Sequence, residues 1–340
     1  MNSLQRMATA AVSLVLCVGA TGTATAAVPT AATASKPSQP SKPSKPSKPS
    51  KSTCRLPAPQ QPGTSASRTI SSGGRDRTYQ LHLPDNYAEK RDWPLVLAFH
   101  GRGNTGAGTE EFSKLSTLPA VVVYPDGVIG TGDGDRQAWQ GAPYAAAGVD
   151  DVRFTEDLLD RLEATLCVDE RRVYATGKSN GAGFVSTLLA CHAADRIAAI
   201  APVAAALYPT GEKCEPSRPV PVIEFHGTGD ATIPYAGDAD RGLPAIQDWV
   251  AGWADRNGCD GRARDRVIGS DITVSRWRGC DRGAEVRHVA VTDGGHTWPG
   301  ADSYSGGGYT TQTIEAHEVM WQFLRQFRTP ASHRSPASHR

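Results

Sequence analysis

Short apolar runs alternate with segments of helical periodicity along most of this chain. Continuous apolar runs are typical of strands buried on both faces of a sheet. They occupy residues 94–99, 120–125, 172–176, 197–203 and 220–225, and a further strand is predicted at 286–291. Residues 77–83 instead alternate polar and apolar side chains, which predicts a half-buried edge strand.

Helical patterns lie between these runs, and the clearest covers residues 152–166 behind Asp150 or Asp151 as the N-cap. Its large apolar residues recur at a spacing near four: Phe154, Leu158, Leu162 and Leu166. Further helices are predicted at 181–191, 243–257 and 314–327. Alternating strands and helices predict an α/β fold, in which one domain (residues 54–328) has a mostly parallel sheet with helices on both faces.

The first 26 residues have the pattern of a secretory signal peptide. Arg6 precedes an apolar stretch, residues 7–20, that is too short to span a bilayer comfortably. Ala24-Thr25-Ala26 offers a cleavage site, and residues 32–34 offer a second one. Cys17 follows a leucine rather than the small residue that a lipoprotein anchor needs, which favours plain secretion. We expect an extracellular protein without a membrane span.

Residues 27–53 form a linker in which Lys-Pro-Ser triplets favour an extended rod. It serves as a spacer or as a basic tether in weak electrostatic contact with a cell wall. Residues 329–340 repeat one short motif and are predicted to be a disordered tail. Beyond residue 75 the chain carries 27 basic against 35 acidic residues. A nucleic-acid reader normally has a basic body, so no nucleic-acid partner is expected. We expect a monomer.

Removal of the signal peptide leaves six cysteines, an even number that favours disulfides in an exported chain. Cys259 and Cys280 flank a short polar segment and are the first predicted pair. The other two pairs follow by elimination and are Cys191 with Cys214, and Cys54 with Cys167.

The segment VYATGKSNGAGF places Ser179 between Gly177 and Gly181, where a predicted strand becomes a helix. The pattern G-x-S-x-G carries little weight alone. A serine hydroxyl needs a base to become nucleophilic, and it must stand clear of the sheet to reach a substrate. A sharp, strained turn exposes the hydroxyl in this way, and it leaves no room for side chains at the two glycines.

Two other predicted strands end in an acid and in an imidazole. Asp230 follows 220–225, and His296 follows 286–291 in a Gly-Gly-His-x-Trp turn. The chain order Ser, Asp, His is that of the nucleophile-elbow triad. Asp238 and Asp240 are rivals for the acid. Three other histidines lie in or directly after strands, where packing or turn roles suit them better: His100, His226 and His288.

Two backbone donors are needed for the oxyanion that forms in such a site. Asn180 directly follows the serine, and the glycine-rich loop 99–106 offers Arg102, or Gly103 next to it. Trp298 and Trp139 could line a binding wall for an acyl or sugar group, or could equally belong to the core.

These motifs, which span residues 77–300 in order, resemble the secreted esterases that include extracellular poly(3-hydroxybutyrate) depolymerases and the feruloyl and acetylxylan esterases of the first carbohydrate-esterase family. The resemblance implies a single α/β-hydrolase domain without metal or cofactor. It also implies Ser179, Asp230 and His296 as the triad, and Trp298 in the substrate cleft. Lys178 departs from the apolar residue that is common before the nucleophile; a cation there favours an acidic substrate or faces solvent.

The function expected from these observations is hydrolysis of feruloyl or acetyl esters of plant xylan through an acyl-enzyme. The alternative is hydrolysis of poly(3-hydroxybutyrate) or its oligomers. A serine peptidase of the same fold and a noncatalytic wall-binding protein are more distant alternatives. A peptidase would cleave peptide amides but not esters, and a binding protein would cleave neither.

Overall fold

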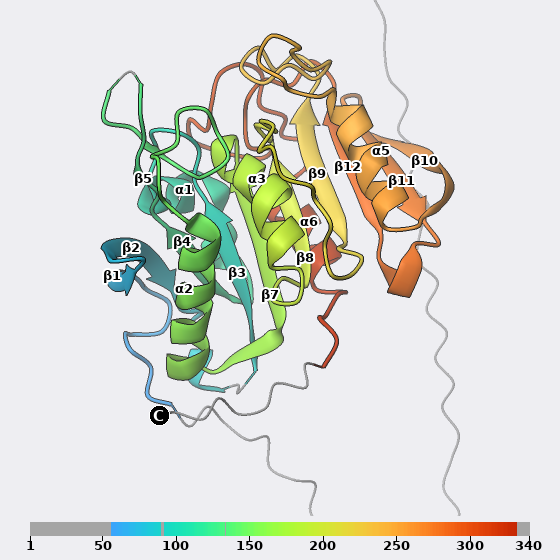
Figure 1. Ribbon diagram of the computed structural model, residues 1–340. Helices are drawn as coiled ribbons and strands as arrows, with labels where there is room; N and C mark the ends of the chain where they lie inside the picture. Colours follow the sequence, from blue (N-terminus) through green and yellow to red (C-terminus); the bar gives the residue numbers. More distant parts are fainter. Residues whose placement is uncertain (1–55, 90–91, 133, 332–340) are drawn as a thin grey trace, which may run out of the picture. The chain divides into compact units, whose positions relative to one another are not determined.

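A computed structural model describes residues 56–89, 92–132 and 134–331 of the chain (Figure 1). The predicted signal peptide, the linker and most of the predicted tail lie outside these residues. The described chain contains a sheet of ten strands in the order β1-β2-β4-β3-β7-β8-β9-β12-β11-β10. The strands are β1 (Ser65–Ser72), β2 (Arg75–His82), β3 (Trp93–Phe99), β4 (Val121–Pro125), β7 (Val168–Lys178), β8 (Ala199–Val203), β9 (Val222–Gly227), β10 (Asp260–Ile268), β11 (Ile272–Arg278) and β12 (Val286–Val291).

The six central strands, from β4 to β12, run parallel, and the two strands on either flank are antiparallel. A separate two-stranded ribbon pairs β5 (Val128–Ile129) with β6 (Gln137–Ala138). The helices are α1 (Gly106–Ser113), α2 (Asp151–Thr165), α3 (Asn180–Phe184), α4 (Ala190–His192), α5 (Ile246–Arg256) and α6 (Ala316–Leu324). A π-helical turn, Val185–Leu189, joins α3 to α4. The predicted mostly parallel sheet is confirmed.

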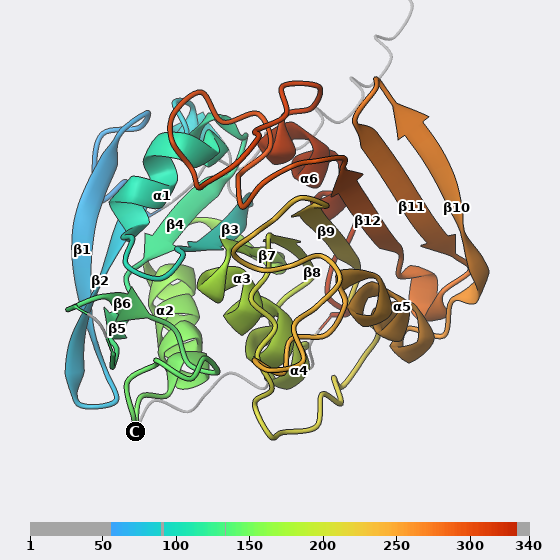
Figure 2. The same ribbon diagram turned by 90° about the horizontal axis from the view of Figure 1, so that it is seen from above.

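Helices cover both faces of the sheet, as predicted. Figure 2 shows α2, α3, α4 and α5 on one side of the sheet and α1 and α6 on the other. Strand alternation divides the core accordingly. In β3, Leu95 and Leu97 pack in the core that holds the apolar faces of α2 and α5, while Val96 and Ala98 pack in the core that holds α6. The continuous apolar runs of the sequence are therefore strands buried on both faces.

The flanks of the sheet differ from the prediction. β2 is not an edge strand, because β1 pairs with it along its full length. At the opposite flank, β10 and β11 form a hairpin that was predicted only as a short polar segment. Its ends are joined by the predicted Cys259–Cys280 disulfide, and the predicted Cys191–Cys214 disulfide is present as well. Cys167 is also disulfide-bonded, and its predicted partner Cys54 lies outside the described residues.

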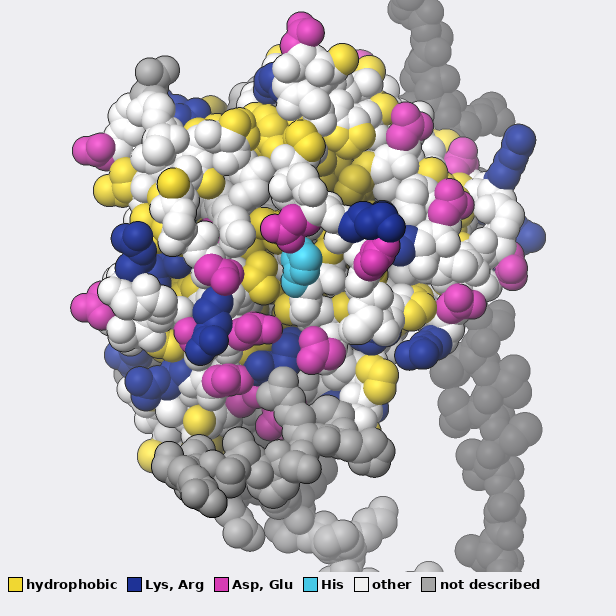
Figure 3. Space-filling model, in the orientation of Figure 1, with side chains coloured by type: hydrophobic (Ala, Val, Ile, Leu, Met, Phe, Trp, Pro, Cys, Tyr) yellow, Lys and Arg dark blue, Asp and Glu magenta, His cyan; other side chains and the backbone are white. Residues whose placement is uncertain are grey.

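Charges of both signs are interspersed on the face that carries α2, α3 and α5 (Figure 3). This distribution fits the 27 basic and 35 acidic residues that the sequence carries after residue 75. Within the part of the chain that the structure describes, every helix is too short or too polar to cross a membrane.

A buried ion pair links β2 to α2 and provides a test of the packing. Arg77 Nη2 donates to Asp151 Oδ1 at 2.8 Å, and both residues are at most 4% exposed. Replacement of Arg77 by leucine is expected to lower the free energy of unfolding by about 3–5 kcal/mol, because the carboxylate stays buried without its cation. Denaturant unfolding measures the loss. The double variant Arg77→Leu/Asp151→Leu should recover part of it, and a larger loss in the double variant would contradict the assignment.

Candidate active site

Ser179 occupies a strained turn between β7 and α3. Its φ is +55° and its ψ is −119°, a conformation that non-glycine residues rarely adopt. A Cβ at Gly181 would lie 2.3 Å from the carbonyl oxygen of Phe99, and a Cβ at Gly177 would lie 2.8 Å from the carbonyl carbon of Gly181. Both glycines are therefore required by close backbone packing, as the sequence predicted.

His296 and Asp230 meet at the same end of the sheet as Ser179. The His296 Nδ1–H donates to Asp230 Oδ2 at 2.7 Å. The other carboxylate oxygen accepts the N–H groups of Thr232 and Ile233, each at 2.8 Å. Burial raises the pKa of Asp230, but hydrogen bonds from His226 and His296 outweigh this effect and hold the pKa well below its usual range. The carboxylate is thus ionised and fixes the His296 ring with Nε2 free to act as a base.

The two rival acids lie elsewhere. Asp238 pairs with the guanidinium of Arg241 at 2.6 Å, and Asp240 is exposed. Asp230, in contrast, is only 4% exposed and lies directly behind the imidazole. The geometry therefore favours Asp230 among the three candidates.

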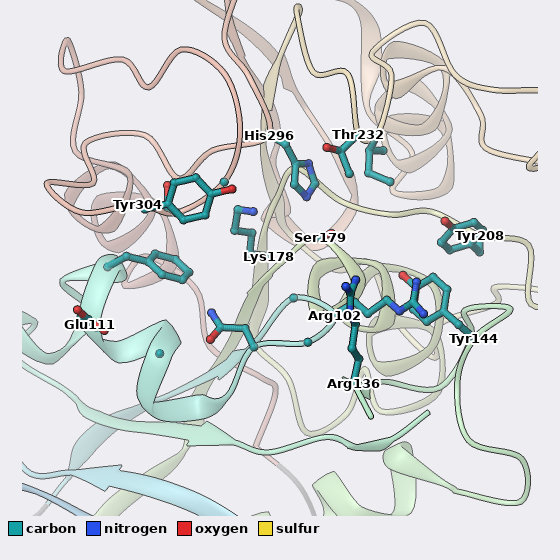
Figure 4. Close-up of a pocket in the computed structure, with 18 of the residues that line it drawn as sticks. Arg102, Glu111, Arg136, Tyr144, Lys178, Ser179, Tyr208, Thr232, His296 and Tyr304 are labelled. Carbon is teal, nitrogen blue, oxygen red and sulfur yellow. The ribbon is translucent and has the colours of Figure 1, made fainter. Parts of the chain in front are cut away.

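A cleft of about 720 Å³ opens above the candidate triad. Ser179 and His296 both line it, and Figure 4 shows the two side by side. Its rim carries side chains that the sequence analysis did not select: Arg136, Tyr144, Tyr208, Arg241 and Tyr304. These residues come from loops whose path no periodicity specifies.

The loop after β3 supplies the second candidate oxyanion donor, and its hydrogen bonds separate Arg102 from Gly103. The Gly103 N–H donates to the Gln137 carbonyl at 2.8 Å and is therefore occupied. The Arg102 N–H has no acceptor among the described residues. As the first residue of α3, Asn180 has no intrahelical acceptor for its own N–H. Arg102 and Asn180 remain the two candidate donors.

His100 holds this loop in place. Its Nε2 accepts the Gly127 N–H at 2.8 Å, and its Nδ1–H donates to the Gly101 carbonyl at 2.8 Å. Burial lowers the pKa of His100 to about 4, so the ring is neutral at physiological pH. The predicted turn role fits this geometry.

The two tryptophans that could line a binding wall or equally belong to the core lie in the core. Trp139 is fully buried, and its backbone N–H and carbonyl bind the side-chain amide of Asn180. Trp298 is 1% exposed and packs edge-on against Phe112 at 5.7 Å. Neither ring lines the cleft. Trp139 instead holds the side chain of Asn180, the residue that follows Ser179.

A chain of buried polar groups behind Asp230 was missed by the sequence analysis. Glu224, fully buried in β9, accepts Nδ1–H groups from His226 at 3.0 Å and from His288 at 2.7 Å. His288 Nε2 accepts the Tyr235 hydroxyl at 2.7 Å. His226 Nε2 donates to the Ile233 carbonyl at 2.9 Å and lies 3.4 Å from Asp230 Oδ2. The sequence contained one signal of this network, the charged Glu224 inside an apolar run. In the structure, the register of β9 and β12 places Glu224 opposite His288.

The hydrogen-bond partners of these buried groups define their charges. Both ring nitrogens of His226 face acceptors, so the ring is an imidazolium. Burial lowers the pKa of His226, but hydrogen bonds to Asp230 and Glu224 outweigh it and raise the pKa to about 10. Within the described ranges, no group of three or more His, Cys, Asp or Glu side chains is arranged to hold a metal ion. Glu224, His226 and His288 therefore form a hydrogen-bonded ion network behind Asp230.

Glu224→Gln is expected to move the acid limb of the pH–rate profile to higher pH. Burial lowers the pKa of His296, and the positive charges of Lys178 and His226 lower it further against the opposing effect of Asp230. A glutamine at position 224 no longer supports the His226 cation. Without that cation His296 binds a proton more readily, so its pKa rises.

The pH dependence of kcat/KM measures this shift, because it reports ionisation in the free enzyme. His317→Gln is the matched control, because His317 pairs with Glu315 at 3.4 Å and does not line the cleft. An acid limb that stays in place, or moves to lower pH, in Glu224→Gln would contradict the coupling.

The fold and the strand-end residues together define an α/β-hydrolase with a serine, a histidine and an aspartate at one edge of the sheet. The model of a family described as "Putative esterase" matches residues 70–321. The chain belongs to this esterase family.

Similar proteins include feruloyl esterases, a bifunctional acetylxylan esterase/xylanase and the putative esterase NocK of Nocardia uniformis subsp. tsuyamanensis. The chain is 29% identical over 264 residues to feruloyl esterase B of Piromyces equi, covering 74% of this chain and 45% of that protein. It is 26% identical over 238 residues to the bifunctional acetylxylan esterase/xylanase XynS20E of Neocallimastix patriciarum, covering 67% of this chain and 32% of that protein. It thus spans less than half the length of these two relatives.

A solved structure shares the fold over most of this chain. The acetyl xylan esterase from Aspergillus awamori superposes with a TM-score of 0.54 at 14% sequence identity, covering 76% of this chain and 98% of that one. The α/β-hydrolase fold expected from the sequence is confirmed.

Proposed function

We propose that this protein is a secreted serine carboxyl-ester hydrolase that acts through an acyl-enzyme on feruloyl or acetyl esters of plant xylan. One observation carries the proposal. The His296–Asp230 hydrogen bond of 2.7 Å lies beside the strained Ser179, and Ser179 and His296 line the same cleft.

In the first half of the reaction, Ser179 Oγ attacks the ester carbonyl carbon while His296 Nε2 takes the hydroxyl proton. The carbonyl oxygen becomes negative, and the N–H groups of Asn180 and Arg102 donate to it. Asp230 stabilises the imidazolium and keeps its proton on Nδ1. The bond to the alcohol then breaks, His296 returns its proton to the leaving oxygen, and the acyl group stays on Ser179.

In the second half, water attacks the acyl-enzyme with His296 again as the base. The bond to Ser179 Oγ breaks, His296 reprotonates the serine, and the carboxylic acid leaves. Each group of the triad thus returns to its starting state after one turnover.

Two observations support the substrate class. Two of the relatives are named for these esters: one is a feruloyl esterase and the other is an acetylxylan esterase/xylanase. The cleft also carries flat aromatic faces, with Tyr144 edge-on to Tyr208 at 5.8 Å and Tyr304 85% exposed. Such rings suit an aromatic acyl group or a sugar ring.

Parallel incubation of the purified protein with methyl ferulate, acetylated xylan and a suspension of poly(3-hydroxybutyrate) tests the proposal. We expect ferulate or acetate release and little acid from the polyester. Acid release from the polyester alone would replace the xylan-ester assignment with the polyester one. The absence of hydrolysis from all three would overturn the esterase proposal.

A further inference from the structure

Lys178 presents a buried, unpaired cation to the cleft. It is the last residue of β7, and alternation places it on the sheet face of Tyr174, whose hydroxyl donates to the Phe327 carbonyl beyond α6. The side chain is therefore directed under the loop that follows His296, and not outward as one reading of the sequence suggested. Only 6% of Lys178 is exposed, although it lines the cleft.

The loop over Lys178 is fixed by its own hydrogen bonds. The His296 N–H donates to the Gly307 carbonyl at 2.8 Å, and the Trp298 N–H donates to Ser305 Oγ at 2.9 Å. A Cβ on Gly306 would lie 3.0 Å from Lys178 Nζ. Figure 4 shows the Lys178 amine between Tyr304 and His296. The amine thus lies in the cleft that Ser179 and His296 line.

No group in the described residues neutralises this amine. Among them, Lys178 Nζ has neither a hydrogen-bond acceptor nor an ion-pair partner. Asp230 is the acid whose charge acts on it, but both Asp230 oxygens are already engaged by His296 and by the N–H groups of Thr232 and Ile233. Burial lowers the pKa of Lys178 to about 8, so the amine keeps its proton at pH 7. A buried charge without a partner is unfavourable, and an anionic ligand would relieve it.

The other charged side chains that line the cleft are mostly positive. Arg102 and Arg136 line it without an ion-pair partner in the described part of the chain, and the Arg102 guanidinium lies over the Tyr144 ring at 4.2 Å. Glu111 is the acid that lines the cleft, at the end near Tyr304. The cleft therefore attracts negative charge, and Lys178 is its most buried cation.

We propose that Lys178 is an anion subsite, and that the preferred substrates are esters that carry a free carboxylate close to the scissile bond. This inference rests on the proposed esterase function and adds a charge preference to its substrates. The carboxylate belongs either to the acyl part, as in a dicarboxylic acid monoester, or to the alcohol part, as in a uronic acid-bearing saccharide.

Two pairs of neutral and anionic esters, assayed at pH 7, distinguish these sources. Monomethyl glutarate against methyl glutaramate places the charge on the acyl side, and 4-acetoxybenzoate against 4-acetoxybenzamide places it on the leaving group. We expect the wild-type kcat/KM to favour the anion at least tenfold in one pair. Lys178→Met should reduce that ratio to threefold or less. Lys213→Met, which removes an exposed lysine that pairs with Glu215 at 2.7 Å and does not line the cleft, is the matched control and should keep the wild-type ratio.

A ratio near one for the wild type in both pairs, or an unchanged ratio in Lys178→Met, would overturn the subsite. Hydrolysis of the neutral esters with no anion preference rejects the subsite alone, whereas no hydrolysis of any ester rejects the esterase proposal. Lys178→Gln replaces Lys178→Met if the latter does not fold. If neither variant folds, the wild type is tested with competitive inhibitors in two pairs, glutarate against glutaramide and benzoate against benzamide. The inhibition constant of the anion must be at least tenfold lower than that of the amide in one pair. Equal inhibition constants reject the subsite.

Discussion

Ser179→Ala is expected to lower kcat for ester hydrolysis by about 10⁵-fold, because it removes the hydroxyl that is proposed to form the acyl-enzyme. The residual rate should still exceed that of water, since the oxyanion donors and the cleft remain. Hydrolysis of p-nitrophenyl acetate measures the rate. A fluorophosphonate that labels the wild type at one serine should leave the variant unlabelled in intact-mass spectra.

The matched control is Ser71→Ala, an exposed position on the edge strand β1. It should keep both the wild-type rate and the label. Retention of more than a hundredth of the wild-type activity in Ser179→Ala would contradict the proposed nucleophile, and so would labelling at another serine.

Asp230→Asn is expected to lower kcat by about 10⁴-fold while the fold is kept. An asparagine can donate to His296 Nδ1 from its amide, which would place the imidazole proton on Nε2 and remove the base. It also withdraws the negative charge that lies 2.7 Å from His296 Nδ1 and 3.4 Å from His226 Nε2. Steady-state kinetics on p-nitrophenyl acetate give the loss, and circular dichroism tests whether the fold is intact.

Asp240→Asn provides the comparison, because Asp240 is an exposed aspartate of the same polar stretch. We expect it to act like the wild type. If Asp240→Asn were as impaired as Asp230→Asn, or if Asp230→Asn kept more than a tenth of the wild-type kcat, the proposed acid would be wrong.

The sequence predicted the central sheet because burial on both faces leaves a simple signal. β3, β4 and β8 consist of apolar residues throughout. The carboxyl ends of parallel strands lie at one edge of the sheet, so the polar residues that follow these strands and their parallel neighbours meet there. Ser179, Asp230 and His296 could be selected on this ground. The flanking hairpin could not, because nearly every residue of β10 is solvent-facing and charged side chains dominate it.

Other features depend on tertiary contacts that no local pattern encodes. α1 contains Gly106 and Gly108, which disfavour a helix, yet a Cβ at Gly106 would lie 2.2 Å from the Tyr124 carbonyl oxygen. Close packing on β4 therefore selects glycine over a better helix former. The fate of Trp139 was open for a similar reason, since the loop that carries it is folded against the core by its bonds to Asn180 and His100.

The order of strands in the sheet has a consequence for the timing of activity. β7, β9 and β12 carry the proposed nucleophile, acid and base, and β12 is the last of the three to be synthesised. A nascent chain that ends at Asp230 holds the proposed nucleophile and acid but lacks His296, the proposed base. Turnover would therefore begin in a single late step, when the final parallel strand docks beside β9, and every earlier folding intermediate would be inert toward esters.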